Sequence, residues 1–331
     1  MRNPTRRPLA AAAALALLAS PALAAEFNAN IEFDNTWQNQ ERGMSQGGRV
    51  ELNALGRTGT SGFVAGKASI LAKRDSSVAI DDLWVQLGNA SADVKLGRFE
   101  AADVFQLGRD TIVSRAGSGF AYRTNALRGR FTGGEFHGAF TLNFSPALSL
   151  ELGVAETKAK AADSGAPVNN GLGVYAKGVR PVLSYNSNGL LLRLGLESGY
   201  IFNETQKFKG GGFTIGYDFS PSVHVNFSAA SAKFTDWTAP SATTGYSTQT
   251  GYSQTSRTVG LNAYLGDAHL AVEGAKNGDE KITTFYASYA FPLMDIKGAT
   301  ITPAFSVSKA RDFVTGLDQD TSVRVRINYT F

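Results

Sequence analysis

Few side chains in this sequence could perform bond chemistry. It contains no cysteine and three histidines, His137, His224 and His269. A hydrolase needs a histidine that another polar group orients beside a nucleophile or an activated water. The three histidines lie in different segments, and no nucleophile motif accompanies them. We therefore expect no catalytic centre, no metal site and no cofactor, and a histidine-dependent hydrolase stays a remote alternative.

Charge placement offers another kind of chemistry. Residues 100–134 mix acidic residues with arginines: Glu100, Asp103, Arg109, Asp110, Arg115, Arg123, Arg128 and Arg130. Elsewhere, alternation with apolar neighbours assigns a second set to one polar face: Arg49, Lys67, Lys73, Trp84, Arg324 and Arg326. Two charged surfaces that face each other across water act on a solute through their electric field, without forming bonds.

The elements that must position these residues are segments in which apolar and polar residues alternate. In residues 321–331 one parity is apolar and ends on an aromatic residue: Val323, Val325, Ile327, Tyr329 and Phe331. The other parity carries Arg324 and Arg326. A β-strand directs successive side chains to opposite faces. In a membrane barrel the apolar face contacts lipid and the polar face lines a wet interior.

The same alternation recurs along the whole chain. We predict sixteen strands, at residues 27–37, 49–57, 63–73, 78–88, 92–99, 135–144, 149–158, 172–185, 190–202, 208–219, 223–234, 255–265, 269–276, 282–291, 300–310 and 321–331. Short turns and longer polar loops alternate between them. No linker divides the chain. The predicted fold is one all-β, transmembrane, antiparallel barrel over residues 25–331.

Residues 126–131 also alternate and would form a seventeenth strand. Bacterial single-chain barrels have an even number of strands, and seventeen would place the polar residues 159–171 on the short-turn side. We therefore treat residues 100–134 as one connection, and loops of about this length are usually functional or disordered. Its aromatic residues could pin it to the inner wall or stack against sugars: Phe105, Phe120, Tyr122 and Phe131.

The first 24 residues have the pattern of a secretory signal peptide. A basic start precedes an apolar run at residues 9–19, and small residues end the segment at Ala24. Three of the 32 Lys and Arg residues lie in it and none of the 28 Asp and Glu residues, which leaves 29 basic and 28 acidic residues. This near-neutral balance gives no reason to expect a nucleic-acid partner.

Two stretches resemble the trimeric sixteen-stranded porins of Gram-negative bacteria. Residues 81–98, DDLWVQLGNASADVKLGR, resemble that family's fourth strand, short turn and fifth strand, and residues 122–131, YRTNALRGRF, resemble the return of its third loop. The terminal Phe331 resembles its assembly signal. The resemblance implies a loop at residues 100–134 that folds into the barrel and forms a constriction, with acidic residues facing a basic wall.

The resemblance also implies partners and a location. They are the outer membrane of a Gram-negative bacterium, its lipid and lipopolysaccharide, the barrel-assembly machinery and two further copies of the chain in a homotrimer. Two departures from the family concern the loops. The five arginines of residues 100–134 leave ion selectivity open, and the second loop, at residues 74–77, is short for the family's latch onto a neighbouring subunit.

These features predict passive diffusion of small hydrophilic solutes and ions through a water-filled channel. The alternative is a substrate-selective channel for carbohydrates, in which Trp84 is the best single candidate for stacking against a sugar ring. Neither reading involves bond chemistry, because a pore discriminates by radius, water filling and charge placement.

Overall fold

The structure is a computed structural model that describes residues 25–39, 43–108, 113–117, 121–130, 136–156, 176–201, 206–235, 238–239, 247–248, 253–313 and 318–331. Over these ranges the chain forms strands, turns and irregular segments. No helix in them is long and apolar enough to cross a membrane. The predicted signal peptide, residues 1–24, lies outside the described residues.

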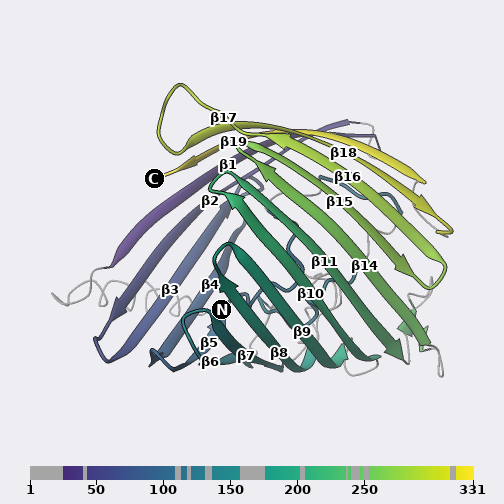
Figure 1. The fold of residues 1–331 in the computed structure, drawn as a ribbon. Coiled ribbons are helices and arrows are strands. Elements are labelled where there is room, and N and C mark those ends of the chain that lie inside the picture. Colours follow the sequence, from purple (N-terminus) through teal and green to yellow (C-terminus); the bar gives the residue numbers. More distant parts are fainter. Residues whose placement is uncertain are drawn as a thin grey trace, which may run out of the picture.

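Sixteen long strands form one closed antiparallel barrel (Figure 1). They are β1 (Glu26–Gln38), β2 (Gly43–Thr58), β3 (Gly62–Lys73), β4 (Val78–Asn89), β5 (Ala92–Arg98), β6 (Phe136–Asn143), β7 (Leu148–Glu156), β8 (Ala176–Ser187), β9 (Leu190–Ile201), β10 (Gln206–Ser220), β11 (Val223–Thr235), β14 (Ser253–Leu265), β15 (Ala268–Asn277), β16 (Glu280–Tyr289), β18 (Ala299–Arg311) and β19 (Gln319–Thr330). Two-residue strands lie in the connections: β12 (Thr238–Ala239), β13 (Ser247–Thr248) and β17 (Phe291–Pro292).

Closure of the barrel pairs its first and last long strands. β1 and β19 run antiparallel, from Asn30 opposite Thr330 to Gln38 opposite Ser322. Every other long strand pairs with the long strand before it and the long strand after it in the sequence. The predicted all-β transmembrane barrel of sixteen strands is confirmed.

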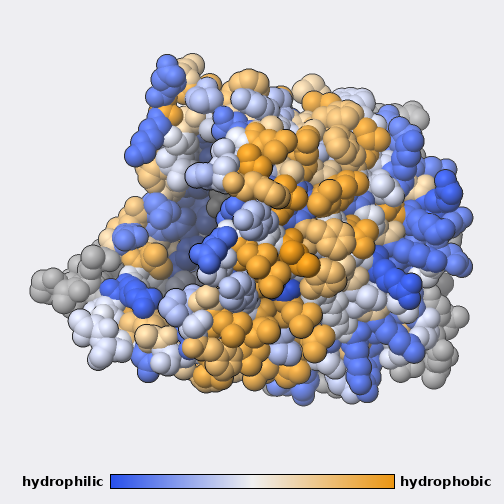
Figure 2. All heavy atoms as spheres, in the orientation of Figure 1, coloured by the Kyte–Doolittle hydropathy of each residue, from blue (hydrophilic) through white to orange (hydrophobic). Residues whose placement is uncertain are grey.

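The barrel is apolar outside and polar inside. In β15, Leu270 and Val272 each keep 39% of their surface exposed, whereas His269, Ala271 and Glu273 are buried. Figure 2 shows apolar residues gathered over much of the visible outer wall, with hydrophilic residues towards its margins. An apolar wall of this extent is unfavourable in water and suits the hydrocarbon of a membrane.

The expected alternation of short and long connections fails at two places. Gly278 has a positive φ of 60° and, with Asp279, joins β15 to β16 in two residues on the side where long loops were predicted. Glycine adopts this backbone conformation without strain, so a tight hairpin replaces a loop. On the other side, β16 and β18 are joined through the small strand β17, which pairs with β18.

The period of two is also interrupted within β4. The pairing of β3 with β4 shifts between Ala68 and Ile70, so that Asp81 and Asp82 together lie opposite Ser69. Such a β-bulge re-aims side chains. Both aspartates are buried, at 7% and 6% exposure.

The ambiguous residues 126–131 do not add a strand to the barrel where they are described. Residues 126–130 form turns, and Gly129 meets Glu100 in an isolated bridge. The choice of sixteen strands over seventeen is confirmed. We call the connection between β5 and β6, residues 99–135, the inner loop.

Candidate functional site

Hydroxyl side chains of the inner wall hold the backbone of the inner loop. Thr214 of β10 donates to the Val104 carbonyl over 2.6 Å, and the Gln106 amide donates to Ser228 Oγ of β11 over 3.1 Å. Two contacts join a later part of the loop to β19 and β18: Ser114 Oγ to Ser322 Oγ at 2.6 Å and Ala116 N to Ser308 Oγ at 2.9 Å. The described parts of the loop therefore reach from β10 to β19 along the interior.

Arg180 of β8 is a fully buried cation that binds the loop. Its Nε lies 3.1 Å from Glu197 Oε1 of β9, and neither side chain is exposed. Its Nη2 donates to the carbonyls of Ala102 over 2.7 Å and Thr124 over 3.1 Å. These carbonyls belong to the outgoing and returning halves of the loop, so one guanidinium attaches both halves to the wall. A buried charge needs such pairing and hydrogen bonding to be tolerated.

Glu197 completes this attachment. Its carboxylate accepts hydrogen bonds from the backbone N–H of Leu127 over 3.0 Å and from the Tyr122 hydroxyl over 2.9 Å. Burial, together with the neighbouring Glu197 carboxylate, raises the pKa of Tyr122 well above its ordinary value. Tyr122 therefore stays a neutral donor throughout the physiological pH range.

Inward-facing glycines leave the space that loop side chains occupy. A β-carbon on Gly195 would lie 2.5 Å from Val104 Cγ2, and one on Gly210 would lie 2.6 Å from Tyr122 Cζ. Glycine within a strand often marks a close approach of another group to the backbone. The wall is therefore shaped to receive the loop.

Two loop arginines converge on one wall carboxylate. Arg115 Nε and Nη2 lie 3.0 Å and 2.8 Å from Oε1 of Glu273 on β15. Arg123 Nε lies 2.6 Å from Oε2 of the same residue, and Arg123 Nη2 contacts that oxygen as well. One carboxylate thus bridges two guanidiniums, and the three groups together carry one net positive charge.

Arg128 pairs with acidic residues of the loop itself. Its Nη2 lies 3.2 Å from Glu100 Oε2 and 3.7 Å from Asp103 Oδ2. The backbone carbonyl of Asp103 in turn accepts a hydrogen bond from Arg193 Nη1 of β9 over 2.7 Å. Both predicted acidic candidates of the described loop are therefore paired with a loop cation.

Arg130 meets the bulge in β4. Its Nη1 lies 3.2 Å from Asp81 Oδ1, and its Nε lies 3.2 Å from Asp82 Oδ1. Burial disfavours the charged form of Arg130, but the attraction of Glu100, Asp82 and Asp81 outweighs it and raises the pKa. The bulge thus gives one loop arginine two wall carboxylates.

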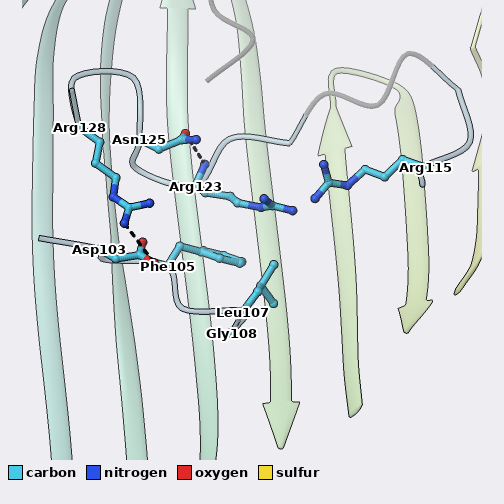
Figure 3. A pocket seen from close by; sticks show the side chains of 8 residues that line it. All are labelled: Asp103, Phe105, Leu107, Gly108, Arg115, Arg123, Asn125 and Arg128. Atoms are coloured by element: carbon cyan, nitrogen blue, oxygen red, sulfur yellow. Dashed lines mark hydrogen bonds and ion pairs between the residues drawn. The ribbon is translucent and has the colours of Figure 1, made fainter. Parts of the chain in front are cut away.

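A cavity of about 290 Å³ lies beside these groups, lined by Asp103, Phe105, Leu107, Gly108, Arg115, Arg123, Asn125 and Arg128. Figure 3 shows the guanidiniums of Arg123 and Arg115 pointing toward each other and Arg128 pointing at Asp103. Three cations and one anion line this space. Such a lining attracts and orients charged solutes by its electrostatic potential.

Three of the wall cations predicted from alternation have acidic partners on the wall. Arg326 Nε and Nη2 lie 2.7 Å from the two carboxylate oxygens of Asp34 on β1. Two further pairs are Arg49 Nε with Glu32 Oε2 at 2.9 Å and Lys67 Nζ with Asp82 Oδ2 at 2.8 Å. Lys73 is exposed at the end of β3, and Arg324 is partly buried on β19. The described residues thus place loop arginines against wall acids, which differs from an acidic loop facing a basic wall.

Trp84 lies on the inner face of β4, between the exposed side chains of Leu83 and Val85. It packs against a buried cluster that includes Phe99. Lys95 Nζ lies 4.5 Å from the centroid of the Trp84 ring, within range of a cation–π interaction. These contacts cover part of the ring that a sugar would need.

The loop aromatics that the structure describes are buried. Phe105 is 3% exposed and Tyr122 is 0% exposed, which favours the interpretation that they pin the loop to the wall. Phe120 and Phe131 lie outside the described residues, as do the predicted constriction residues Arg109 and Asp110.

The three histidines lie on separate strands. His137 stacks on Phe99 with ring centroids 4.1 Å apart, and His269 stacks on Tyr264 at 4.2 Å. His224 of β11 contacts Asp218 of β10. No group of three or more His, Cys, Asp or Glu side chains suited to a metal ion occurs among the described residues.

Phe331 follows the last residue of β19. Its backbone N–H donates to the Ala29 carbonyl over 3.1 Å, and its carbonyl accepts from the Ala29 N–H over 2.9 Å. The residue is 62% exposed, and its ring stacks on that of Tyr329 with centroids 5.2 Å apart. The backbone of Phe331 thus extends the seam between β1 and β19, while its side chain stays on the outer surface.

Sequence reasoning missed the wall residues that hold the inner loop, namely Arg180, Glu197 and Glu273. Each lies on the inward parity of its strand, and Glu273 has exposed Val272 on its outer side. A search for inward acidic residues as well as inward basic ones would have found Glu197 and Glu273. Their loop partners could not be read from periodicity, because the described loop residues form no strand that would fix which side chains meet the wall.

No protein-family model and no curated protein matches the sequence. Solved structures do match, at low sequence identity. OmpT, an outer membrane protein of Vibrio cholerae, matches in its in-vitro folded form with a TM-score of 0.65 and 10% identity, over 95% of this chain and 99% of that chain. Its trimer form matches with a TM-score of 0.62 and 9% identity, over 94% of this chain and 100% of that chain.

Two porin structures match as well. A refined porin structure has a TM-score of 0.61 and 12% identity, over 93% of this chain and 100% of that chain. A mutant of the Rh. blastica porin has a TM-score of 0.56 and 12% identity over the same shares. At these identities the likeness concerns architecture, and it shows that this chain has the fold of outer-membrane β-barrels.

Proposed function

We propose that this chain is an outer-membrane porin, a water-filled channel for the passive diffusion of small hydrophilic solutes and ions. The observation that carries the proposal is the closed barrel with an apolar exterior and a charged inner wall. A loop that contains arginines and acidic residues is attached along this inner wall. A wall of this kind faces lipid on one side and water on the other. Charges within a narrowed lumen select by size and potential.

The location and partners follow from the same proposal. Residues 1–24 serve as the export signal, and the barrel-assembly machinery inserts residues 25–331 into the outer membrane of a Gram-negative bacterium. There the apolar wall contacts lipid and lipopolysaccharide. The match to the trimer form of OmpT from Vibrio cholerae supports a homotrimer. No catalytic step is proposed, and the inner loop with its flanking wall residues serves as the constriction.

The test is conductance in planar lipid bilayers. Protein that migrates as a heat-modifiable species on gels is added to a bilayer in KCl. We expect stepwise current increases with a linear dependence on voltage, and a conductance that rises with KCl concentration. Heat-denatured protein is the control and inserts no channels. A folded, heat-modifiable barrel that never conducts would contradict the proposal.

The carbohydrate-selective alternative has a separate readout in the same experiment. It requires an oligosaccharide at millimolar concentration to block the current, and Trp84→Ala to abolish that block. The packing of Trp84 against Phe99 and the position of Lys95 over its ring favour a structural role for it. We therefore expect oligosaccharides to leave the current unblocked. Hydrolysis of lipid or peptide that is lost when His137, His224 or His269 is replaced would instead support an enzyme.

A further inference from the structure

We propose that the cavity beside the inner loop binds a small anionic solute through a carboxylate or phosphate group held between Arg115 and Arg123. The inference deepens the proposed function and rests on it, because it names the class of solute that the channel retains. Under this proposal the constriction both limits the size of solutes and binds one class of them.

The first support is the number of N–H donors that Arg115 and Arg123 have beyond those directed at Glu273. Arg115 uses Nε and Nη2 toward Oε1, and Arg123 uses Nε and Nη2 toward Oε2. A guanidinium carries five N–H donors in a planar fork. Within the part of the chain that the structure describes, no acceptor is recorded for the Nη1 group of either arginine. Both forks therefore retain donors for a second anion.

The second support is the layering of the three charges. The Glu273 side chain is 3% exposed, whereas the side chains of Arg115 and Arg123 are 19% and 25% exposed. The carboxylate thus lies behind the guanidiniums, on the wall. A solute in the cavity meets two cations first, and a charge-assisted pair in a partly desolvated space is stronger than one in bulk water.

The rest of the cavity limits what can bind. Its other charged residues are Arg128 and Asp103, and Arg128 already pairs with Glu100 and Asp103. A second anionic group would therefore bind less favourably near Arg128 than near Arg115. Phe105 contributes an apolar floor, with the Arg123 guanidinium 5.9 Å from its ring centroid. A volume of about 290 Å³ is small for a ligand pocket, so the occupant is a small solute such as inorganic phosphate or a short-chain carboxylate.

The test measures equilibrium binding to the whole, heat-modifiable protein in detergent solution. Inorganic phosphate and succinate are titrated by calorimetry into the wild type, Arg115→Gln, Arg123→Gln and the double variant. We expect each single variant to weaken binding about tenfold, as the loss of one charge-assisted hydrogen bond does. The matched control is Arg257→Gln, which removes an exposed arginine from β14, the strand next to β15. It should leave binding unchanged.

Channel recordings supply the second measurement. In a KCl gradient we expect the reversal potential of the wild type to show a preference for chloride. We expect the reversal potentials of Arg115→Gln and Arg123→Gln to shift toward the value of a potassium-selective channel. Millimolar phosphate should reduce the wild-type chloride current and leave the variant currents unaffected. If the double variant does not fold, the single variants carry the test.

The outcomes separate this inference from the proposed function. A channel that conducts, but binds neither phosphate nor succinate, overturns the anion site and leaves the porin proposal standing. Equal binding by the wild type and both single variants also overturns it. A folded barrel that binds phosphate through Arg115 and Arg123 but never conducts supports the site and contradicts the porin.

Discussion

At the residue scale, the ion pair between Arg180 and Glu197 fastens both halves of the inner loop to the wall. Both side chains are unexposed and both hydrogen-bond to loop groups. Removing one partner of a buried pair leaves an uncompensated charge, which costs about 3–5 kcal/mol. The strand ladders that form the barrel do not depend on this pair. The cost therefore falls on the loop and not on the barrel.

The first prediction concerns Glu197→Gln. We expect the variant to assemble as a heat-modifiable barrel whose open-channel current is noisier and on average larger, because the loop detaches transiently. The matched control is Glu156→Gln on β7, which also removes half of an ion pair between neighbouring strands. Its partner is Lys177, and the two side chains are 44% and 48% exposed. Exposed pairs contribute little, so this variant should conduct as the wild type does. Equal noise in both variants would contradict the loop-anchoring role.

Alternation along a strand predicts which face a residue occupies, but it does not predict the partner of that residue. It predicts Arg49, Lys67 and Arg326 on one polar face, and in the structure each of them pairs with an acidic residue. Their partners depend on the register between strands, and the register of Arg326 with Asp34 joins residues at opposite ends of the chain. The partners of the loop arginines depend on the path of the inner loop, which strand periodicity does not determine.

At the element scale, small residues of β10 create room for the loop. Gly210 faces Tyr122, and the next inward residue, Gly212, faces Thr124. A β-carbon at Gly210 would overlap the Tyr122 hydroxyl and lie 2.7 Å from the β-carbon of Ala232. Valine by itself favours strands. At this position its side chain would conflict with Tyr122 of the loop and would also crowd Ala232 of the paired strand β11.

The second prediction follows for Gly210→Val. We expect a folded barrel in which Tyr122 is displaced from Glu197 and the conductance rises. Tyr122→Ala should raise the conductance as well, and the double variant should match the larger of the two single effects, because both act on the same contact. Additive effects would show that Gly210 acts elsewhere. The control is Gly274→Val on β15, where a β-carbon meets Val259 at an ordinary 3.7 Å.

The elements themselves were largely predictable. A lipid-facing strand must alternate over its whole length, so each predicted strand overlaps an observed one. The bulge at Asp81 and Asp82 was not predicted, because two adjacent aspartates before Leu83 and Trp84 fit a regular strand as well as a bulged one. The two-residue turn at Gly278 also escaped prediction, because glycine and aspartate suit short and long connections alike.

At the scale of the whole molecule, three outward Tyr–Phe pairs mark one rim of the barrel. They lie at or just beyond the ends of β10, β16 and β19, which run in the same direction, and they are Tyr217 with Phe219, Tyr289 with Phe291 and Tyr329 with Phe331. Aromatic residues gather where hydrocarbon meets the polar surface of a membrane. The terminal Phe331 is thus one of several interfacial anchors in the finished barrel.

Because several Tyr–Phe pairs lie at this rim, an anchoring role of Phe331 can be tested separately from a role in assembly. This is the third prediction. Phe331→Ala keeps the two backbone hydrogen bonds to Ala29 and loses only an exposed ring. We expect protein refolded in detergent to unfold at nearly the wild-type temperature. On the proposal that the last strand acts as an assembly signal, we expect few heat-modifiable barrels to form in cells.

The matched control is Phe291→Ala, which removes the ring of a residue that is 48% exposed at the same rim and whose ring lies at 45° to that of Tyr289 with centroids 4.5 Å apart. It should assemble in cells as the wild type does. If both variants assemble equally poorly, the rim acts through its total aromatic content and Phe331 has no special part. If both assemble normally, the resemblance of the last strand to an assembly signal has no functional consequence. Only a defect confined to Phe331→Ala, with refolding in detergent intact, assigns to one residue a role in insertion that its contacts in the finished barrel do not require.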